Sequence, residues 1–335
     1  MILKIQNFFD IIFIKQIIGR RNVMKKMLFV FNPHSGKGLI RQHIINIVDI
    51  FVKDGYEVTL HPTQAQNDAY EKVFSRCGDF DAIVCSGGDG TLNETIKALM
   101  KTERRIPLGY IPSGTMNDFA SSIGIPKDMP EAASVIVNGE PVSVDIGSFN
   151  EDHFTYIAAF GAFTDVSYET PQQMKNMFGS LAYIMEGMRR LNTAKSYHVT
   201  VINGDERIED EFIFGMVSNS TSVGGFKGLG GTEVKLDDGV FEVFLIKTPK
   251  SLPEFQLTIN AFLRREMDSE YFVSFKSKQV EFHSDDDLPW TLDGEFGGNC
   301  RNVCVKNNCR AIDIFARQLG GMDSPLSGGG EPPQA

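Results

Sequence analysis

The chain has 335 residues, of which 42% are hydrophobic and 23% charged, and its formal net charge at pH 7 is −10. This length suffices for about two ordinary domains, and the composition is typical of a soluble globular protein. Nucleic-acid-binding proteins usually carry a basic surface, so the acidic balance argues against that class, and an anionic ligand would need local donors.

The cysteines and histidines indicate neither a disulfide framework nor a transition-metal centre. The five cysteines form no CxxC pair, and the six histidines are dispersed without an HxxxH pair. The spacing of Cys300, Cys304 and Cys309 allows a metal cluster as an alternative, but reduced thiols of a cytosolic protein fit the pattern better.

The two ends of the chain differ from the part between them. Residues 1–26 are apolar but contain Asp10 and Lys15 and no small-residue cleavage site, which argues against a signal peptide and a membrane span. An amphipathic helix on a membrane surface and a non-native extension both stay open as interpretations. Residues 319–335 are rich in Gly, Pro and Ser, so we expect a disordered tail.

Residues 27–145 alternate apolar strands with glycine-containing turns and amphipathic helices. The runs "MLFVF", "DAIVCSGG" and "PLGYIPSG" each lead into such a turn, and a helical pattern follows. This alternation predicts an α/β domain with a parallel sheet covered on both faces. Ligands of such sheets bind at the carboxyl ends of the strands, where these turns would lie.

Residues 146–309 show short β-branched and aromatic runs separated by polar turns. We predict an all-β sandwich for this region, interrupted by one helix at 181–191. The last apolar run, at 310–318, is predicted to return to the first domain as a closing strand or helix.

The turn "GGDGT" carries the strongest signal for a phosphate site. Gly87, Gly88 and Gly90 allow the backbone to approach a polyphosphate, and the helix N-terminus that follows favours negative charge. Asp89 would repel phosphate unless a cation lies between them, so we predict that Asp89 binds Mg²⁺. A tight turn without a ligand is the alternative, because glycine and aspartate favour turns.

Two further turns have related chemistry. "NPHSGKG" at 32–38 offers backbone N–H groups but lacks the spacing of a Walker A loop, and it is a weak signal by itself. In "PSGTMNDFA", Thr115 after Gly114 can donate to phosphate, and Asp118 can accept from a lysine or from metal-bound water; a helix cap by Asn117 or Asp118 is the alternative. Three such turns at one sheet edge predict a nucleotide site.

In order and spacing, "NPHSGKG", "SGGDGTLNE" and "PSGTMNDFA" resemble the diacylglycerol kinase catalytic family of bacterial soluble lipid kinases and sphingosine kinases. The resemblance covers residues 27–317 and implies a phosphofructokinase-like nucleotide-binding domain followed by a β-sandwich lipid-substrate domain. It implies transfer of the γ-phosphoryl group of ATP to a lipid hydroxyl, with diacylglycerol as expected acceptor and phosphatidic acid as product. Such an enzyme would work in the cytoplasm as a peripheral protein at the inner face of the membrane, and a homodimer stays open.

The resemblance also implies roles for individual residues. "WTLDGEF" matches the family's distant Asp-Gly-Glu motif and makes Glu295 the general base for the lipid hydroxyl, a task that suits a carboxylate of the second domain. The ATP contacts carried over from the family are Asn32, Pro33, His34, Ser35, Gly36, Thr63, Gly88, Asp89, Gly90, Thr91, Leu92, Asn93, Glu94 and Thr115.

A second, structural Mg²⁺ is implied near "EVKLDDGVFEV". Its ligands would be the Asp238 carboxylate and the backbone carbonyls of Lys235 and Val240. A hairpin without an ion is the alternative, because Asp-Gly is a common hairpin signal. The sequence also departs from relatives here, since "FKGLGGTEVKL" lacks a Pro-x-Ala element.

Other functions stay open. Phosphatidylglycerol, a sphingoid base or an isoprenoid alcohol would present one hydroxyl to the same base. NAD kinases and phosphofructokinases share the GGDG turn, although Asn93 and Glu94 directly after it, with the late "LDGE", favour a lipid kinase. A non-catalytic nucleotide- or lipid-binding regulator is the last alternative, and the presence of Asp89, Asp118 and Glu295 argues against it.

Overall fold

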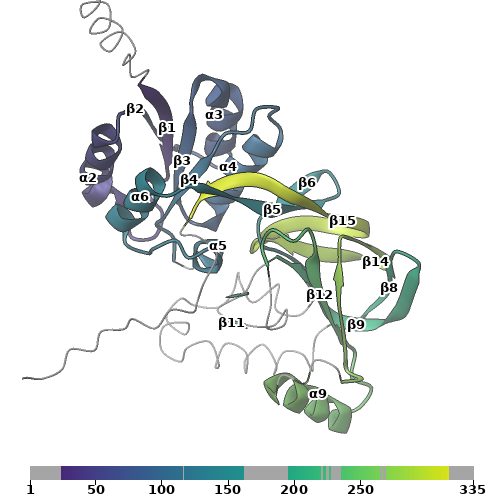
Figure 1. The fold of residues 1–335 in the computed structure, drawn as a ribbon. Coiled ribbons are helices and arrows are strands. Elements are labelled where there is room, and N and C mark those ends of the chain that lie inside the picture. The colour runs from purple at the N-terminus through teal and green to yellow at the C-terminus, as the bar shows by residue number, and fades with distance from the viewer. Residues whose placement is uncertain are drawn as a thin grey trace, which may run out of the picture.

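The computed structural model describes residues 24–115, 117–161, 195–219, 222–223, 226–227, 235–264, 266 and 269–316. The predictions for residues 1–23, for the helix at 181–191 and for the tail at 319–335 lie outside these ranges. Figure 1 shows an α/β region and a β-rich region, and this division confirms the coarse fold prediction.

The α/β region is built around four parallel strands. Its elements are β1 (Lys25–Phe31), α2 (Ile40–Lys53), β2 (Tyr56–Pro62), α3 (Asp68–Arg76), η1 (Cys77–Asp79), β3 (Ala82–Gly87), α4 (Asp89–Met100), β4 (Leu108–Pro112), α5 (Asp118–Ser122) and α6 (Met129–Asn138). β1 pairs in parallel with β2 and β3, and β3 pairs in parallel with β4, so the order is β2-β1-β3-β4.

The strands read as nearly continuous apolar runs because helices cover both faces of this sheet. Right-handed crossovers place α2 on one face and α3 with α4 on the other, and Figure 1 shows α2 beside α6 and α3 beside α4. Phe51 of α2 is buried with its ring edge against Phe29 of β1, at 5.9 Å between centroids. The amphipathic helices are therefore held by the sheet that they cover.

The β-rich region continues the same sheet. Its elements are β5 (Pro141–Phe149), β6 (Asp152–Phe154), β7 (Ile157–Gly161), β8 (Tyr197–Asn203), β9 (Glu206–Ser218), β10 (Ser222–Val223), β11 (Phe226–Lys227), β12 (Phe241–Lys247), α9 (Leu252–Arg264), β13 (Phe272–Ser277), β14 (Gln279–Leu292) and β15 (Glu295–Phe315). β15 pairs antiparallel with β5 and meets β4 in parallel at Ile314↔Leu108, so one 13-stranded sheet spans both regions.

The strand pairing differs from the predicted sandwich of two separate sheets. β9 pairs with β8 through its first half and with β7 through its second half. β14 also pairs with both β7 and β8, so these four strands close a ring. Local alternation in the sequence reveals each strand but not that one long strand serves two neighbours.

The described residues form two apolar cores. One lies within the ring around Trp290, whose side chain packs against Phe149, Phe160 and Phe282 at centroid distances of 5.1, 4.9 and 5.3 Å. The other joins the α/β region to the opposite face of β7, β9 and β12 and holds the two regions together. Among the described helices, none is both long and apolar enough to cross a membrane.

Candidate active site

Three turns of the α/β region meet at the carboxyl edge of the parallel sheet. Asn32 N, after β1, donates to Ser86 O of β3 at 2.8 Å. Ser113 N, after β4, donates to Gly87 O at 2.9 Å. These bonds extend the strand pairing into the turns, so the three glycine-containing segments lie side by side.

Contacts between the turns require glycine at two positions. A Cβ atom at Gly114 would lie 2.5 Å from Gly88 Cα, and one at Gly36 would lie 2.3 Å from Ser113 O. Gly36 also has a φ of +58°, a conformation that favours glycine. Close packing of the turns is thus a reason for glycine in addition to the approach of a phosphate.

Asp89 begins α4, and its carboxylate is largely removed from water. Its Oδ2 accepts a hydrogen bond from Asn117 N at 3.1 Å, whereas the buried Oδ1 has no hydrogen-bond partner. Burial raises the pKa of Asp89 to about 7, and the negative charges of Asp118 and Asp293 add to this effect. The fold therefore holds this carboxylate in a place where its charge is poorly stabilised by the protein alone.

This environment fits a divalent cation. A hard positive ion would bind the free Oδ1 atom and stabilise the ionised form of Asp89. Asp118 is also buried and supplies the second carboxylate of the turns. Nowhere in the described ranges do three or more His, Cys, Asp or Glu side chains form a complete metal site. Phosphate oxygens of a nucleotide would have to complete the coordination.

Asn117 holds two of the turns together. Its φ is +53°, its Oδ1 accepts from Gly114 N at 3.0 Å, and its Nδ2 donates to Gly114 O at 2.8 Å. The buried Tyr110 hydroxyl lies 3.2 Å from both Asn117 Oδ1 and Gly87 O. Asn117 occupies the N-cap position of α5, which begins at Asp118, but its side chain makes no capping bond to that helix.

Arg41 of α2 holds the first turn. Its Nε donates to Pro33 O at 3.0 Å, and its Nη2 lies 3.3 Å from His34 Nδ1. Ser35 is the residue that faces the neighbouring turn, because its Oγ lies 3.6 Å from the position of a Cβ at Gly88. Of the predicted ATP contacts Pro33, His34 and Ser35, Ser35 thus has the side chain nearest to the GGDG turn.

Asp293 joins the β14–β15 turn to both regions. Its carboxylate accepts hydrogen bonds from the backbone N–H groups of Thr155, Tyr156 and Ile157 at 2.6, 2.9 and 3.1 Å. Asn93 Nδ2 of α4 donates to the same carboxylate at 2.5 Å. Asn93, a predicted ATP contact, therefore also positions the turn that carries the predicted base.

Glu295 lies beside the first turn of α4. A Cβ atom at Gly90 would lie only 2.6 Å from Glu295 Oε1, so the carboxylate reaches the residue next to Asp89. Glu295 is exposed, in contrast to the buried Asp293. The structure thus brings the Glu295 carboxylate to the N-terminal turn of α4, which begins with Asp89, although the two acids are 206 positions apart in the sequence.

Other predicted ATP contacts have roles in the fold. The Leu92 side chain lies in the core, with 1% exposure. Glu94 Oε1 accepts from Asn67 N at 2.9 Å and Oε2 from Ala69 N at 3.2 Å, so this carboxylate binds the N-terminal turn of α3. Thr63 is buried after β2, and Thr115 is exposed beside Gly114. Thr91 packs close to Gly87, where a Cβ would lie 2.4 Å from Thr91 Cβ.

The loop predicted to hold a structural Mg²⁺ is pinned by protein groups. Asp145 Oδ2 of β5 accepts from Gly239 N at 2.7 Å, and Asp145 Oδ1 accepts from Arg310 N at 2.7 Å. The Arg310 guanidinium contacts Asp237 Oδ2 at 3.2 Å. Asp238, the predicted ligand, is exposed and its Oδ1 accepts from Val240 N at 3.2 Å. Within residues 235–240, the described part of this loop, no buried side-chain oxygen lacks a partner that an ion would supply, and ligation by Lys235, Asp238 and Val240 stays a prediction.

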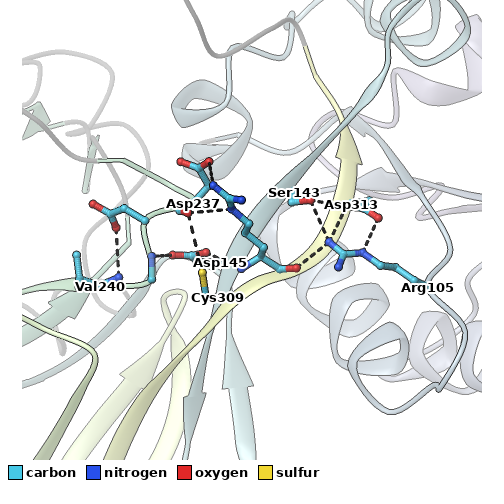
Figure 2. A network of polar contacts seen from close by, with 10 residues as sticks. Arg105, Ser143, Asp145, Asp237, Val240, Cys309 and Asp313 are labelled. Atoms are coloured by element: carbon cyan, nitrogen blue, oxygen red, sulfur yellow. Dashed lines mark hydrogen bonds and ion pairs between the residues drawn. The ribbon is translucent and has the colours of Figure 1, made fainter.

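Figure 2 shows that this network continues to the α/β region. Arg105, before β4, donates through Nε to Asp313 Oδ2 at 2.5 Å and through Nη2 to Arg310 O at 2.7 Å. Ser143 Oγ donates to Asp313 Oδ1 at 2.7 Å. We name the whole network the junction; its members are Arg105, Ser143, Asp145, Asp237, Arg310 and Asp313.

Several residues of the site and junction were not anticipated from the sequence. Tyr110 and Tyr156 lie in or beside ordinary apolar strands, and nothing in their spacing indicates hydrogen bonds to turns. Asp145 had one signal, an acid inside the apolar run "PVSVDIGSF", since a buried acid needs partners. Those partners, Gly239 and Arg310, follow only from the tertiary structure.

Comparisons with known proteins agree with this arrangement. Residues 26–149 match the family model of the diacylglycerol kinase catalytic domain. Over 278 residues the chain is 34% identical to a diacylglycerol kinase of Bacillus subtilis strain 168, which covers 82% of this chain and 91% of that protein. A diacylglycerol kinase of Staphylococcus aureus strain JH9 is 33% identical over 294 residues, 87% of this chain and 92% of that protein.

The fold agrees as well. A crystal structure of a diacylglycerol kinase from Bacillus anthracis strain Sterne superposes with a TM-score of 0.68, at 21% identity, and covers 89% of this chain and 99% of that one. That likeness concerns the fold, whereas the two relatives above are matched over nearly their whole length at more than 30% identity. The chain belongs to the diacylglycerol kinase family and is a kinase.

Proposed function

We propose that the protein transfers the γ-phosphoryl group of ATP to the free hydroxyl of diacylglycerol and so produces phosphatidic acid. One observation carries the proposal: Glu295 Oε1 reaches Gly90, next to Asp89 with its unpartnered Oδ1. A proton acceptor and a cation-binding carboxylate thus lie at one helix N-terminus, where phosphate is favoured. Phosphoryl transfer depends mainly on such positioning and charge neutralisation.

The three turns bind and orient the triphosphate in this proposal. The backbone N–H groups of Gly36, of residues 88–90 and of Thr115 donate to phosphate oxygens, and the N-terminal turn of α4 adds its dipole. The N–H groups of Asn32, His34 and Gly114 instead hold the turns together. Asp89 would hold Mg²⁺ with Asp118 acting through water, and the ion would neutralise charge on the phosphates. The inter-turn bonds of Asn117 and Tyr110 keep these groups in place before the nucleotide arrives.

Glu295 acts on the acceptor. Its carboxylate takes the proton of the lipid hydroxyl, the hydroxyl oxygen bonds to the γ-phosphorus, and the bond from that phosphorus to the β–γ bridging oxygen breaks, which releases ADP. Asp293 does not take part in proton transfer, because four donors already occupy its two oxygens. It positions the turn from which Glu295 projects.

The acceptor resides in a bilayer, so the enzyme must work at a membrane surface. We place it at the cytoplasmic face as a peripheral protein, since ATP is available there and no described helix is able to span the bilayer. Co-sedimentation with anionic liposomes tests this placement, and full-length protein that stays in the supernatant at low salt would contradict it.

The reaction itself is tested with labelled ATP, Mg²⁺ and a panel of acceptors. The panel contains diacylglycerol, phosphatidylglycerol, a sphingoid base, an isoprenoid alcohol and NAD, and we expect the highest kcat/KM with diacylglycerol. Glu295→Gln should lower kcat by about 100- to 10,000-fold, the usual contribution of a general base. The matched control is Glu140→Gln, an exposed residue between α6 and β5. Wild-type-like activity of Glu295→Gln, or a preference for NAD, would refute the proposal.

A further inference from the structure

Two phenylalanine side chains are exposed in the described part of the chain. Phe74 of α3 is 51% exposed and stacks on Tyr70, with 5.7 Å between the ring centroids, whereas Phe296 of β15 is 64% exposed. Single exposed apolar side chains are ordinary on protein surfaces and need no ligand. Phe296 differs in its place, because it directly follows Glu295, the proposed general base. A large apolar ring thus lies in water beside the residue that acts on a lipid.

The turn before Phe296 has a fixed backbone. Leu292 and Glu295 are opposite each other in β14 and β15, and the two residues between them, Asp293 and Gly294, have φ values of +51° and +84°. Positive φ at both residues is typical of the tight two-residue turn that Asp-Gly favours. Four hydrogen-bond donors also hold the carboxylate of Asp293. Glu295 and Phe296 therefore project from a rigid turn.

β15 contains a bulge directly after Phe296. Phe296 is opposite Thr291, and the next pair is Trp290 with Gly298. Gly297 therefore has no residue opposite it and is the extra residue of the bulge. Bulges change the direction of a strand and are frequent beside active sites. The turn and the bulge together fix the backbone on both sides of Phe296.

The Phe296 ring points away from the proposed nucleotide site. Successive residues of a strand project from opposite faces, and the Glu295 carboxylate reaches the position of a Cβ at Gly90, at the N-terminus of α4. Phe296 projects from the other face, which it shares with Thr291 and Ala159, the residues opposite it along β14 and β7. Bound nucleotide would therefore leave the ring exposed.

The proposed acceptor brings an apolar phase to this ring. Diacylglycerol lies in a bilayer, and the Glu295 carboxylate has to come within about 2.6–3.2 Å of its hydroxyl to take the proton. Adjacent Cα atoms are about 3.8 Å apart, so Phe296 reaches the membrane surface together with Glu295. An exposed apolar ring gains free energy when it leaves water for acyl chains.

We propose that the Phe296 side chain enters the bilayer next to the acceptor and brings Glu295 to the level of the acceptor hydroxyl. Phe296 is then a positioning residue, which anchors the catalytic turn at the membrane and takes no part in proton transfer. This inference rests on the proposed function and names the surface through which the enzyme meets its lipid. Phe296 should therefore matter only where the acceptor lies in a bilayer.

The first experiment compares a long-chain diacylglycerol in phosphatidylcholine vesicles with a short-chain diacylglycerol dissolved as a monomer. These vesicles carry almost no net charge, so attraction of basic side chains contributes little. Phe296→Ala should lower kcat/KM for the vesicle acceptor by about tenfold, because the exposed part of the ring loses its burial, and should leave kcat/KM for the dissolved acceptor within about twofold. Phe296→Leu should retain most of the activity with vesicles. Phe74→Ala, which removes a similarly exposed ring from α3, is the matched control and should change neither value.

The second experiment detects insertion without turnover. Trp290, the single tryptophan of the chain, is fully buried, so brominated phosphatidylcholine should not quench the fluorescence of the wild-type protein. Phe296→Trp places an indole ring at the exposed position, and we expect brominated vesicles that contain diacylglycerol to quench its emission. Phe74→Trp is the control and should be quenched no more than the wild type.

The two readouts separate this inference from the proposed function. An equal loss of kcat/KM with both acceptors in Phe296→Ala would show that the ring supports the catalytic turn itself, and would overturn the inference. Full activity of Phe296→Ala with vesicles, or no quenching of Phe296→Trp, would overturn it as well. If the wild type phosphorylates neither acceptor while Phe296→Trp is quenched, the proposed function fails and the membrane contact of Phe296 stands.

Discussion

The turns at the sheet edge and the junction each contain a buried acid, but the two acids differ in how fully their carboxylate oxygens are hydrogen-bonded. In the junction, Asp145 receives a backbone N–H on each carboxylate oxygen, and neighbouring charges are paired, as Arg105 is with Asp313. In the turns, Asp89 has one free oxygen and a pKa raised to about 7 by burial and by neighbouring acids.

The difference separates a structural site from a functional one. A buried polar group that needs no ligand is satisfied by the protein, because an unpaired one is costly. A group that awaits a ligand has to stay unsatisfied until the ligand binds, and the protein loses stability in exchange for function. Substitutions of the free acid and of the satisfied groups should therefore have opposite effects on stability.

Asp89→Asn should have the largest effect on activity. We expect kcat to fall at least about 1000-fold, the scale typical of groups that neutralise charge in phosphoryl transfer. The measurement is steady-state phosphorylation of diacylglycerol over a range of Mg²⁺ concentrations, with Asp205→Asn in the exposed β8–β9 turn as control. Recovery of activity at high Mg²⁺ would reduce the role of Asp89 to one of affinity, and full activity would remove it from the site.

The same substitution should stabilise the protein without Mg²⁺ at pH 8. The folded-state pKa of Asp89 is about 7 against 3.8 in the unfolded chain, so the folded state binds more protons between these values and loses stability as the pH rises. The wild type should therefore be less stable than Asp89→Asn by up to about 4 kcal/mol at pH 8, and this gap should close towards pH 4. Urea unfolding at both pH values measures it, and a variant less stable at pH 8 would contradict the comparison.

Asp293→Asn, in contrast, should destabilise the folded protein. Asp293 has partners on both oxygens, and an amide group would set an NH₂ against backbone N–H donors. We expect a loss of about 3 kcal/mol in the free energy of unfolding, together with lower activity, because the turn that carries Glu295 loses its anchor. Asp210→Asn, which removes a surface ion pair with Lys247, is the control and should change stability by about 1 kcal/mol or less. Equal stability changes in the two variants would show that Asp293 is no anchor.

Gly90→Ala should separate catalysis from folding. The added methyl group would meet Glu295 Oε1 at 2.6 Å, while alanine suits a helix better than glycine. We expect kcat to fall about tenfold, as a small displacement of a reacting group does, with unchanged or higher thermal stability. Gly78→Ala, which meets nothing within 4 Å, is the control for the effect of alanine itself. An unchanged kcat would mean that Glu295 works from another position.

The α/β region was predictable because its signals are local. A buried strand, a glycine-containing turn and a helix follow one another within about 25 residues, and parallel pairing brings the turns to one edge. The strand ring and the junction were not predictable from local signals. β9 and β14 each divide one edge between β7 and β8, and Asp145 contacts Gly239 and Arg310 from distant segments. Glu295 was found only because its motif resembled a family, for nothing local links it to Gly90.

The smallest change in stability is expected for a substitution in the junction. Arg105 is half exposed and binds Asp313 through two nitrogens, and an ion pair of this exposure contributes about 1 kcal/mol. Arg105→Gln should lower the free energy of unfolding by that amount in low salt and by less in high salt, because ions screen exposed charges. Arg264→Gln, whose contact with Glu266 is 3.9 Å long at the end of α9, is the control and should have no measurable effect. Because the apolar core shared by the two regions would still hold them together, kcat should stay within about twofold of wild type, as expected for a surface pair. A larger fall in kcat without a loss of stability would show that the junction sets the position of Glu295 relative to Asp89, and would make it part of the catalytic apparatus rather than a joint.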